Sequence, residues 1–419
     1  MKSLLLKNAL IFDGVSEERS LGHVVVEQGL IKEVADTLPT GEFEVTLDVQ
    51  GRTLMPGLID AHIHAYFPDV DAGKVDKMPM TLVAHHARRM LEASLQRGFT
   101  SVRDCGGGDY GLYLAIERGW IAGPRLFYCG KALSQSGGHG DKRLPHEEIF
   151  CGCGIKDPLG CFEGHRTRVV DGPENLRLAV REELRRGASF IKIMGSGGVA
   201  SPADPIKLAQ YSADEISAVV DEVERHDTYV TAHIHPDGAL RRCIELGVRC
   251  IEHGTLITDD TAALAAERDV SIVPTLAVID ALSRFGHEAG FPPVSQAKLA
   301  AIQPLAIGSL ERMKRAGVRM GFGTDLIGQL DKHQCLEFSL RSQVLTPLEI
   351  LRSATSINAQ ILRAENKIGR IATGLIADMI VVDGDPLADI GLLAQDGRKV
   401  PVVLKDGQIF KNELNQIAG

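Results

Sequence analysis

Six residues whose side chains can bind metal ions follow short apolar segments in the middle of the chain. Side chains two residues apart on a strand point to the same side, so the histidines of the segment DAHIH could hold one metal ion from a rigid element. A lone histidine at a strand end is more often an ordinary hydrogen-bonded residue than a ligand. Six candidates in equivalent positions are hard to explain by chance, and they predict a metal site. They are His62, His64, Lys192, His233, His253 and Asp325.

The lysine of this set stands inside an apolar segment, FIKIMG at residues 190–195. An unpaired ammonium group is costly to bury, and burial disfavours its charged form. Lys192 therefore needs either a partner or a change in its charge state.

Apolar segments alternate with segments of helical periodicity throughout residues 56–364. Repeated units of this kind indicate a parallel sheet that is covered on both faces. Eight such units in about 300 residues fit a (β/α)8 TIM barrel, in which the carboxyl ends of the strands carry the chemistry. We therefore predict an α/β fold of this type, with a doubly wound open sheet as the alternative. The predicted strands cover 58–66, 100–105, 125–130, 190–195, 229–235, 250–254, 271–276 and 320–326, and predicted helices include 81–98, 173–187 and 212–226.

The two ends of the chain differ from the middle. Residues 1–55 and 365–419 contain short apolar stretches separated by Gly and Asp turns, with no segment of helical periodicity. Chain termini often lie close together, so these pieces predict one composite β-sandwich domain beside a barrel at 56–364.

The composition excludes several classes of protein. Of 419 residues, 44% are hydrophobic and 24% are charged, which is typical of a folded globular chain rather than a disordered one. The net charge of −9 and the single Trp120 argue against a nucleic-acid-binding protein. There is no apolar run long enough for a membrane helix, and Lys7 interrupts the apolar N-terminus. We predict a cytoplasmic protein with reduced cysteines, and a leader removed from a precursor stays open as an alternative.

The motifs PGLIDAHIH, FIKIMGSGG, AHIH, IEHG and GTD resemble those of the amidohydrolase superfamily of binuclear metal hydrolases. The resemblance covers the whole length of the chain. The segment GRIATGLIADMIVVDGDP resembles the one in which chains of that family return from the barrel to the small sheet domain. The segments GFTSVRDCGG, GPRLFYCGKALSQSGGHGD and IKIMGSGGVASPAD resemble the metal-dependent dipeptidase branch. That branch cleaves Xaa-Pro, Xaa-Arg or Xaa-Lys dipeptides and N-acyl amino acids, and some relatives hydrolyse ochratoxin A.

The resemblance implies a role for each of the six candidates. His62, His64 and Asp325 would hold the more buried of two divalent metal ions, most simply zinc, and His233 and His253 the more exposed one. Carbon dioxide would convert the lysine of the set into a carbamate that bridges the two ions. Such a pair of ions activates water and polarises the scissile carbonyl.

The resemblance also implies that Asp325 accepts the proton of the water and passes it to the leaving amine. His139, in the segment SGGHGD, could donate a hydrogen bond to the carbonyl oxygen, or it could only stabilise its loop. His235 and Tyr211 could line the substrate pocket. A structural role for His235, or a place at the start of a helix for Tyr211, is an equal alternative. No residue stands out as the anchor of a substrate carboxylate.

Three cysteines, Cys151, Cys153 and Cys161, cluster in an insertion together with His146 and His165. Their spacing fits no standard zinc motif, so simple loop packing is the favoured interpretation. The resemblance implies a homo-oligomer, and octamers are common in this branch. The partner is then a small amide or dipeptide substrate, with no nucleic acid and no membrane.

Two alternatives to a dipeptidase-type amidase remain. One is a cyclic amide or lactone hydrolase similar to the hydantoinase or imidazolonepropionase branches. The other is a non-catalytic relative that lost its ligands, and the six filled positions argue against it.

Overall fold

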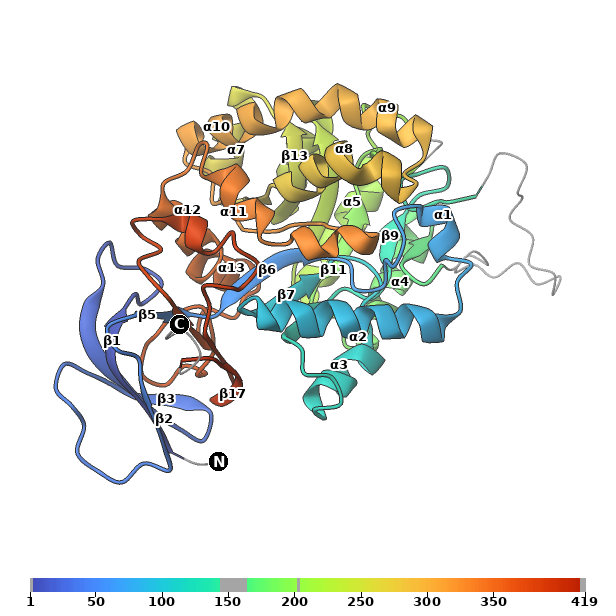
Figure 1. The fold of residues 1–419 in the computed structure, drawn as a ribbon. Helices are drawn as coiled ribbons and strands as arrows, with labels where there is room; N and C mark the ends of the chain where they lie inside the picture. Colours follow the sequence, from blue (N-terminus) through green and yellow to red (C-terminus); the bar gives the residue numbers. More distant parts are fainter. Residues whose placement is uncertain (1–2, 144–163, 202–203, 415–419) are drawn as a thin grey trace.

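The computed structural model describes residues 3–143, 164–201 and 204–414. A mixed sheet lies to one side, and two parallel sheets covered by helices form the larger part of the molecule (Figure 1).

The mixed sheet brings the two ends of the chain together. Its strand order is β17-β16-β15-β5-β1-β2-β3, and β4 pairs with β1. Apolar side chains from both ends share one buried cluster, which includes Leu6, Val24, Val402 and Leu404. The domain boundaries near residues 55 and 365 stay a prediction. The strands are β1 (Leu4–Ile11), β2 (Ser20–Glu27), β3 (Leu30–Ala35), β4 (Val45–Asp48), β5 (Thr53–Pro56), β15 (Met379–Val382), β16 (Val402–Lys405) and β17 (Gln408–Asn412).

The parallel sheets contain strands at seven of the eight predicted positions. One sheet has the order β6-β7-β8 and the other β10-β9-β11-β12-β13-β14, in which the short strands β9 and β10 were not predicted. Nearly all residues of these strands are buried, because helices cover the sheets. The strands are β6 (Leu58–Ile63), β7 (Phe99–Asp104), β8 (Arg125–Tyr128), β9 (Ala132–Ser134), β10 (Thr167–Val169), β11 (Ile191–Met194), β12 (Val230–Pro236), β13 (Cys250–Leu256) and β14 (Ser271–Val273).

The predicted strand at 320–326 is wrong, since only Met320 forms a β-bridge, with Ile272 of β14. The segment still bonds to both neighbours. Ala61 of β6 donates to the carbonyl of Phe322 at 2.8 Å, and Gly321 donates to the carbonyl of Ile272 at 2.9 Å. Asp325 adopts a left-handed φ of 54°, which no regular strand contains. The segment therefore connects β14 to β6 without forming a ladder.

Helices occupy the predicted positions 81–98, 173–187 and 212–226 as α2, α4 and α5. The last begins at a capping box in which Ser212 and Glu215 bond each other's backbone amides. The helices are α1 (Ala72–Val75), α2 (Met80–Gln96), α3 (Tyr110–Glu117), α4 (Pro173–Arg185), α5 (Ala213–Arg225), α6 (Asp237–Glu245), α7 (Asp259–Glu267), α8 (Leu276–Ala289), α9 (Pro293–Ile302), α10 (Ala306–Ala316), α11 (Leu336–Arg341), α12 (Pro347–Ser353) and α13 (Ser356–Ile361), with short 3-10 turns η1 (Gln303–Leu305), η2 (Gly328–His333) and η3 (Ile390–Leu392).

The alternation of parallel strands and covering helices makes this a TIM-barrel-like α/β fold with an added β domain. Among the described helices, none is both long and apolar enough to cross a bilayer.

Asn358 of α13 holds the irregular segment against the first parallel strand. Its amide donates to the carbonyls of Ile59 and Phe322 at 2.7 and 2.8 Å and accepts from the amide of Phe322 at 3.1 Å. The side chain is fully buried. We expect Asn358→Leu to lower the free energy of unfolding by about 3 kcal/mol, because it removes three buried hydrogen bonds worth about 1 kcal/mol each. Differential scanning calorimetry should show a melting temperature about 5 °C lower.

The control is Asn175→Leu, which removes a surface hydrogen bond to the carbonyl of Asp171. A shift as large as that of the buried variant would contradict the proposed link between the two segments.

Candidate metal centre

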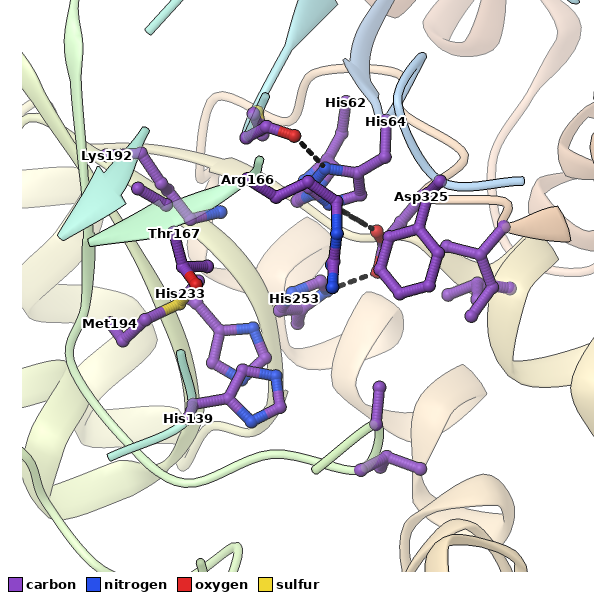
Figure 2. Close-up of a pocket in the computed structure, with 18 of the residues that line it drawn as sticks. His62, His64, His139, Arg166, Thr167, Lys192, Met194, His233, His253 and Asp325 are labelled. Atoms are coloured by element: carbon purple, nitrogen blue, oxygen red, sulfur yellow. Dashed lines mark hydrogen bonds and ion pairs between the residues drawn. The ribbon is translucent and has the colours of Figure 1, made fainter. Parts of the chain in front are cut away.

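Three of the predicted ligands converge on one point at the carboxyl ends of the strands (Figure 2). The Nε2 atoms of His62 and His64 lie 3.4 Å apart. Oδ1 of Asp325 lies 3.3 Å from the first and 3.1 Å from the second. Burial alone would raise the pKa of Asp325, but the two imidazoles hold it well below its usual range. Two nitrogen donors and one carboxylate are a ligand set that suits a divalent ion such as zinc.

A second group contains His233 and His235 of β12 and His253 of β13. One ligand atom from each lies within 4.8 Å of the others. Burial lowers the pKa of His233 and of His253 well below the usual range, so both rings are neutral. Nδ1 of His253 lies 2.7 Å from the hydroxyl of Thr275, which leaves Nε2 for the cavity. Nε2 of His233 is buried without a hydrogen-bond partner among the described residues, as suits a nitrogen that receives a metal ion.

Backbone strain accompanies two of these positions. His253 has a φ of 75° and Asp325 a φ of 54°, in the left-handed region that residues other than glycine seldom adopt. Such strain costs about 1–3 kcal/mol per residue and persists only where the surroundings impose it. The strain aims both side chains at the cavity.

Asp60 of β6 helps to impose this geometry. It is fully buried and accepts hydrogen bonds from the amide of His62, from the amide and hydroxyl of Thr324, and from the side chain of Gln334. Its carboxylate thereby ties the first ligand strand to the segment that carries Asp325.

Lys192 of β11 is 2% exposed and lines the same cavity. Its side chain forms no hydrogen bond or ion pair with any residue that the structure describes. No described neighbour therefore acts as the partner that a buried ammonium group needs, which leaves a change in the charge state of Lys192 as the alternative.

His139 also lines the cavity, where its ring stacks on that of His233 with centroids 4.2 Å apart. Its Nδ1 lies 3.1 Å from the carboxylate of Asp204 and 3.2 Å from the hydroxyl of Ser201. The Nδ1–H donates to this carboxylate, so the neutral ring presents Nε2 as an acceptor. Donation to a substrate carbonyl therefore requires the protonated ring, a condition that the sequence did not reveal.

The structure separates the two predicted pocket residues. His235 lines the cavity, and its ring stacks on His253 at 5.0 Å. Tyr211 does not reach it. Its side chain is buried, and its hydroxyl donates to the carbonyl of Val170 at 3.2 Å. The φ of 56° at Tyr211, just before the capping box of α5, turns the ring into the core rather than toward the ligands.

Two cations that the sequence did not single out face the cavity. Lys142 is half-buried, and desolvation lowers its pKa to about 8. The guanidinium of Arg166 lies over the ring of Phe67 at 3.9 Å, and its Nε is buried without a hydrogen-bond partner on the described chain. They lie on either side of the insertion at 144–163 in the sequence, and no local sequence pattern indicated them.

The cavity and its open mouth together contain about 850 Å³ that no protein atom fills. One wall of the cavity is apolar. This wall is formed mainly by Val278, Ile279, Leu282, Leu299 and Ile302 of helices α8 and α9.

The predicted cysteine cluster lies outside the described residues, as does His146. His165 is described, and its Nε2 lies 3.3 Å from the carbonyl of Met78. The five cysteines that the structure describes, Cys105, Cys129, Cys243, Cys250 and Cys335, are buried free thiols.

A TIM-barrel-like fold with metal-binding side chains at the carboxyl ends of its strands defines a class of barrel enzymes. The chain belongs to the amidohydrolase family, whose family model matches residues 53–410.

It is 34% identical over 367 residues to the ochratoxinase of Aspergillus niger, covering 85% of this chain and 75% of the relative. Its structure is similar to that of a prolidase complexed with N-methylphosphonate-L-proline, with 46% identity, a TM-score of 0.93, and coverage of 98% of this chain and 100% of that one. A Xaa-Pro dipeptidase with bound methionine matches with 28% identity and a TM-score of 0.86, over 98% and 100% of the two chains. The predicted dipeptidase branch is confirmed, and the chain is a hydrolase of amide or peptide bonds.

Gly198, in the loop after β11, lies against the rings of the cluster. A Cβ atom there would lie 2.5 Å from Nε2 of His233 and would also contact the ring of His139. We expect Gly198→Ala to lower amide hydrolysis at least tenfold, because the added methyl group displaces these rings. Steady-state kinetics and the melting temperature should be measured together.

Gly238 of α6 is the matched control, because a Cβ there meets no atom within 4 Å. Gly238→Ala should keep full activity. Equal activity in both variants would contradict the close packing at Gly198.

Proposed function

We propose that the protein is a binuclear metal-dependent amidohydrolase that cleaves the amide bond of dipeptides or N-acyl amino acids. The observation that carries the proposal is the convergence of histidine and carboxylate ligand atoms on a cavity whose other charged groups are cations. The similarity to a prolidase and to an ochratoxinase supports the same substrate class.

The residues present fit two divalent ions. His62, His64 and Asp325 would hold one, and His233 and His253 the other. The unpartnered Nε2 of His233 supports this assignment. Zinc suits these nitrogen and oxygen ligands.

Lys192 would complete the site as a carbamate formed with carbon dioxide. That reaction replaces a buried ammonium group, which lacks a partner on the described chain, by an anionic oxygen ligand. The burial of this lysine among the other ligands supports it.

The bound ions would supply an activated water and a Lewis acid for the scissile carbonyl. Asp325 would accept the proton of that water and deliver it to the leaving amine. His139, held by Asp204, would donate to the carbonyl oxygen only after its Nε2 takes up a proton, against the burial that lowers the pKa of this ring.

Lys142 and Arg166 would bind the free carboxylate of the substrate. Both are cations on the cavity wall, and the buried Arg166 has an unused Nε donor. The apolar wall of α8 and α9 would then receive an apolar part of the substrate. Assembly as a homo-oligomer, including an octamer, and a cytoplasmic location stay predictions.

The main test is amino-acid release from a panel of dipeptides, N-acyl amino acids and ochratoxin A after reconstitution with zinc and bicarbonate. We expect release by the wild type and a loss of 10²–10⁴-fold in kcat for Asp325→Asn, because the proton acceptor is removed. The zinc content of both proteins should be measured in the same samples.

Asp260→Asn, at an exposed carboxylate of α7, is the control and should retain full activity. If a fully metallated wild type released no amino acid from any substrate of the panel, the proposal would be contradicted. Cyclic amides and lactones would then be the favoured substrates.

The carboxylate anchor can be tested with two substrates that differ only there, an N-acyl amino acid and its carboxamide. We expect Arg166→Gln to lower kcat/KM for the acid 10- to 100-fold, mainly through KM, because a charge-assisted hydrogen bond worth about 1.5–3 kcal/mol is lost. The carboxamide should be affected far less. An equal loss for both substrates would show that Arg166 supports the structure rather than the carboxylate.

A further inference from the structure

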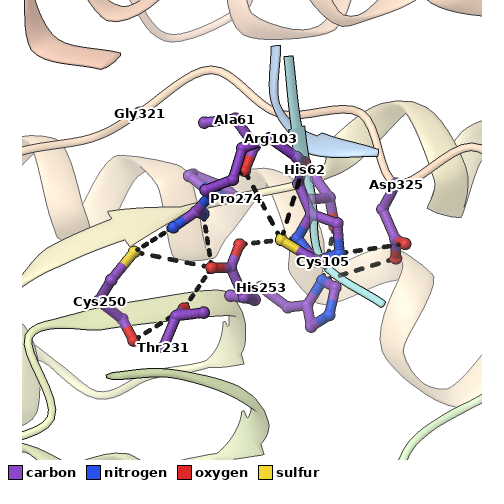
Figure 3. A network of polar contacts seen from close by, with 12 residues as sticks. Ala61, His62, Arg103, Cys105, Thr231, Cys250, His253, Pro274, Gly321 and Asp325 are labelled. Atoms are coloured by element: carbon purple, nitrogen blue, oxygen red, sulfur yellow. Dashed lines mark hydrogen bonds and ion pairs between the residues drawn. The ribbon is translucent and has the colours of Figure 1, made fainter. Parts of the chain in front are cut away.

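A buried ion pair joins two strands of the parallel sheets beside the metal-binding cluster (Figure 3). Arg103 lies on β7 and Glu252 on β13, and both side chains are fully buried. Nη2 of Arg103 donates to Oε1 of Glu252 at 2.6 Å. The hydroxyl of Thr231, on the intervening strand β12, donates to the same oxygen.

The second carboxylate oxygen serves a predicted metal ligand. Oε2 of Glu252 lies 2.7 Å from Nδ1 of His62. An ionised carboxylate only accepts hydrogen bonds, so the imidazole proton must stand on Nδ1. The lone pair of the neutral ring is then on Nε2, the atom that faces His64 and Asp325.

Arg103 fixes this arrangement from behind. Its Nε donates at 2.5 Å to the carbonyl of Ala61, the residue before His62. Its Nη1 lies 3.4 Å from the hydroxyl of Tyr229, and its guanidinium lies 5.2 Å from the ring centre of Phe190. Arg103 therefore holds both the backbone next to the ligand and the carboxylate that orients the ligand ring.

The contribution of a buried salt bridge to folding stability does not explain why an ion pair occupies this place. A buried salt bridge is often no more stabilising than apolar side chains of the same size. An apolar pair, however, could not determine which nitrogen of His62 carries the proton. Partners of this kind commonly change metal affinity 10- to 100-fold.

We propose that Arg103 and Glu252 are positioning residues that act through His62, holding its ring and its tautomer so that Nε2 faces the metal ion. The inference rests on the metal centre of the proposed function and adds to it the residues that determine how tightly the ion is held. Neither residue touches substrate in this view.

The test is the double variant Arg103→Gln with Glu252→Gln. It removes both charges together, so no unpaired charge remains buried, and the amide at position 252 can bond either tautomer of His62. Two quantities should be measured: the melting temperature of the metal-free protein, and the dissociation constants for zinc from competition with a chelator. We expect the metal-free protein to stay folded, with a melting temperature lowered by the loss of the hydrogen bond to Ala61, and zinc binding weakened 10- to 100-fold at one site.

The matched control is Arg125→Gln with Asp378→Asn. This largely buried pair joins β8 to the residue before β15, and its bonds run to each other and to Asp406 rather than to a predicted ligand or its segment. The control should leave both zinc dissociation constants unchanged. If it weakened zinc binding as much as the test variant, the effect would belong to any buried pair and the inference would be overturned.

Wild-type zinc affinity in the folded Arg103/Glu252 double variant would overturn the positioning role and leave the proposed function intact. A wild-type protein that binds no zinc would overturn both. If the double variant does not fold, Thr231→Val decides the matter, because it removes only the hydroxyl that holds Oε1 of Glu252. Zinc binding at least threefold weaker would support the inference, and unchanged binding would refute it.

Discussion

One backbone hydrogen bond determines where the metal-binding side chains meet. The amide of Asp325 donates to the carbonyl of His62 at 2.8 Å and joins the last segment of the parallel sheets to the first strand. Without a regular ladder, this short contact and the side chain of Asp60 set the distance between the two positions. The left-handed φ of Asp325 then turns its carboxylate toward both imidazoles. The cluster thus depends on a local departure from strand geometry.

Fully buried arginines compensate for the irregular backbone around this segment. Arg341 donates to the carbonyls of Pro274, directly after β14, and of Gly321, in the irregular segment 320–326. Arg103 donates in the same way to the carbonyl of Ala61. Buried carbonyl groups that lack a ladder partner must be satisfied in another way. The five-donor guanidinium can do this while its charge is balanced by Glu337 or Glu252.

The cavity itself divides into three chemically different parts. Histidine and carboxylate ligand atoms form one part, the cations Lys142 and Arg166 a second, and apolar side chains from α8 and α9 a third. Such a division suits a small molecule that combines a reactive carbonyl, a negative charge and an apolar group. The amidohydrolase family membership and the geometry therefore point in the same direction.

The sequence by itself predicted the six candidate ligands, seven of the parallel strands and the family, because strand periodicity and residue type are local properties. It did not predict the irregular path at 320–326, since regular hydrophobic spacing does not reveal a left-handed residue. The place of Tyr211 in the core, the Asp204 partner of His139, and the cations Lys142 and Arg166 at the cavity were decided only by tertiary structure. Each of these depends on which distant segment packs against the residue, and no spacing along one chain encodes that directly.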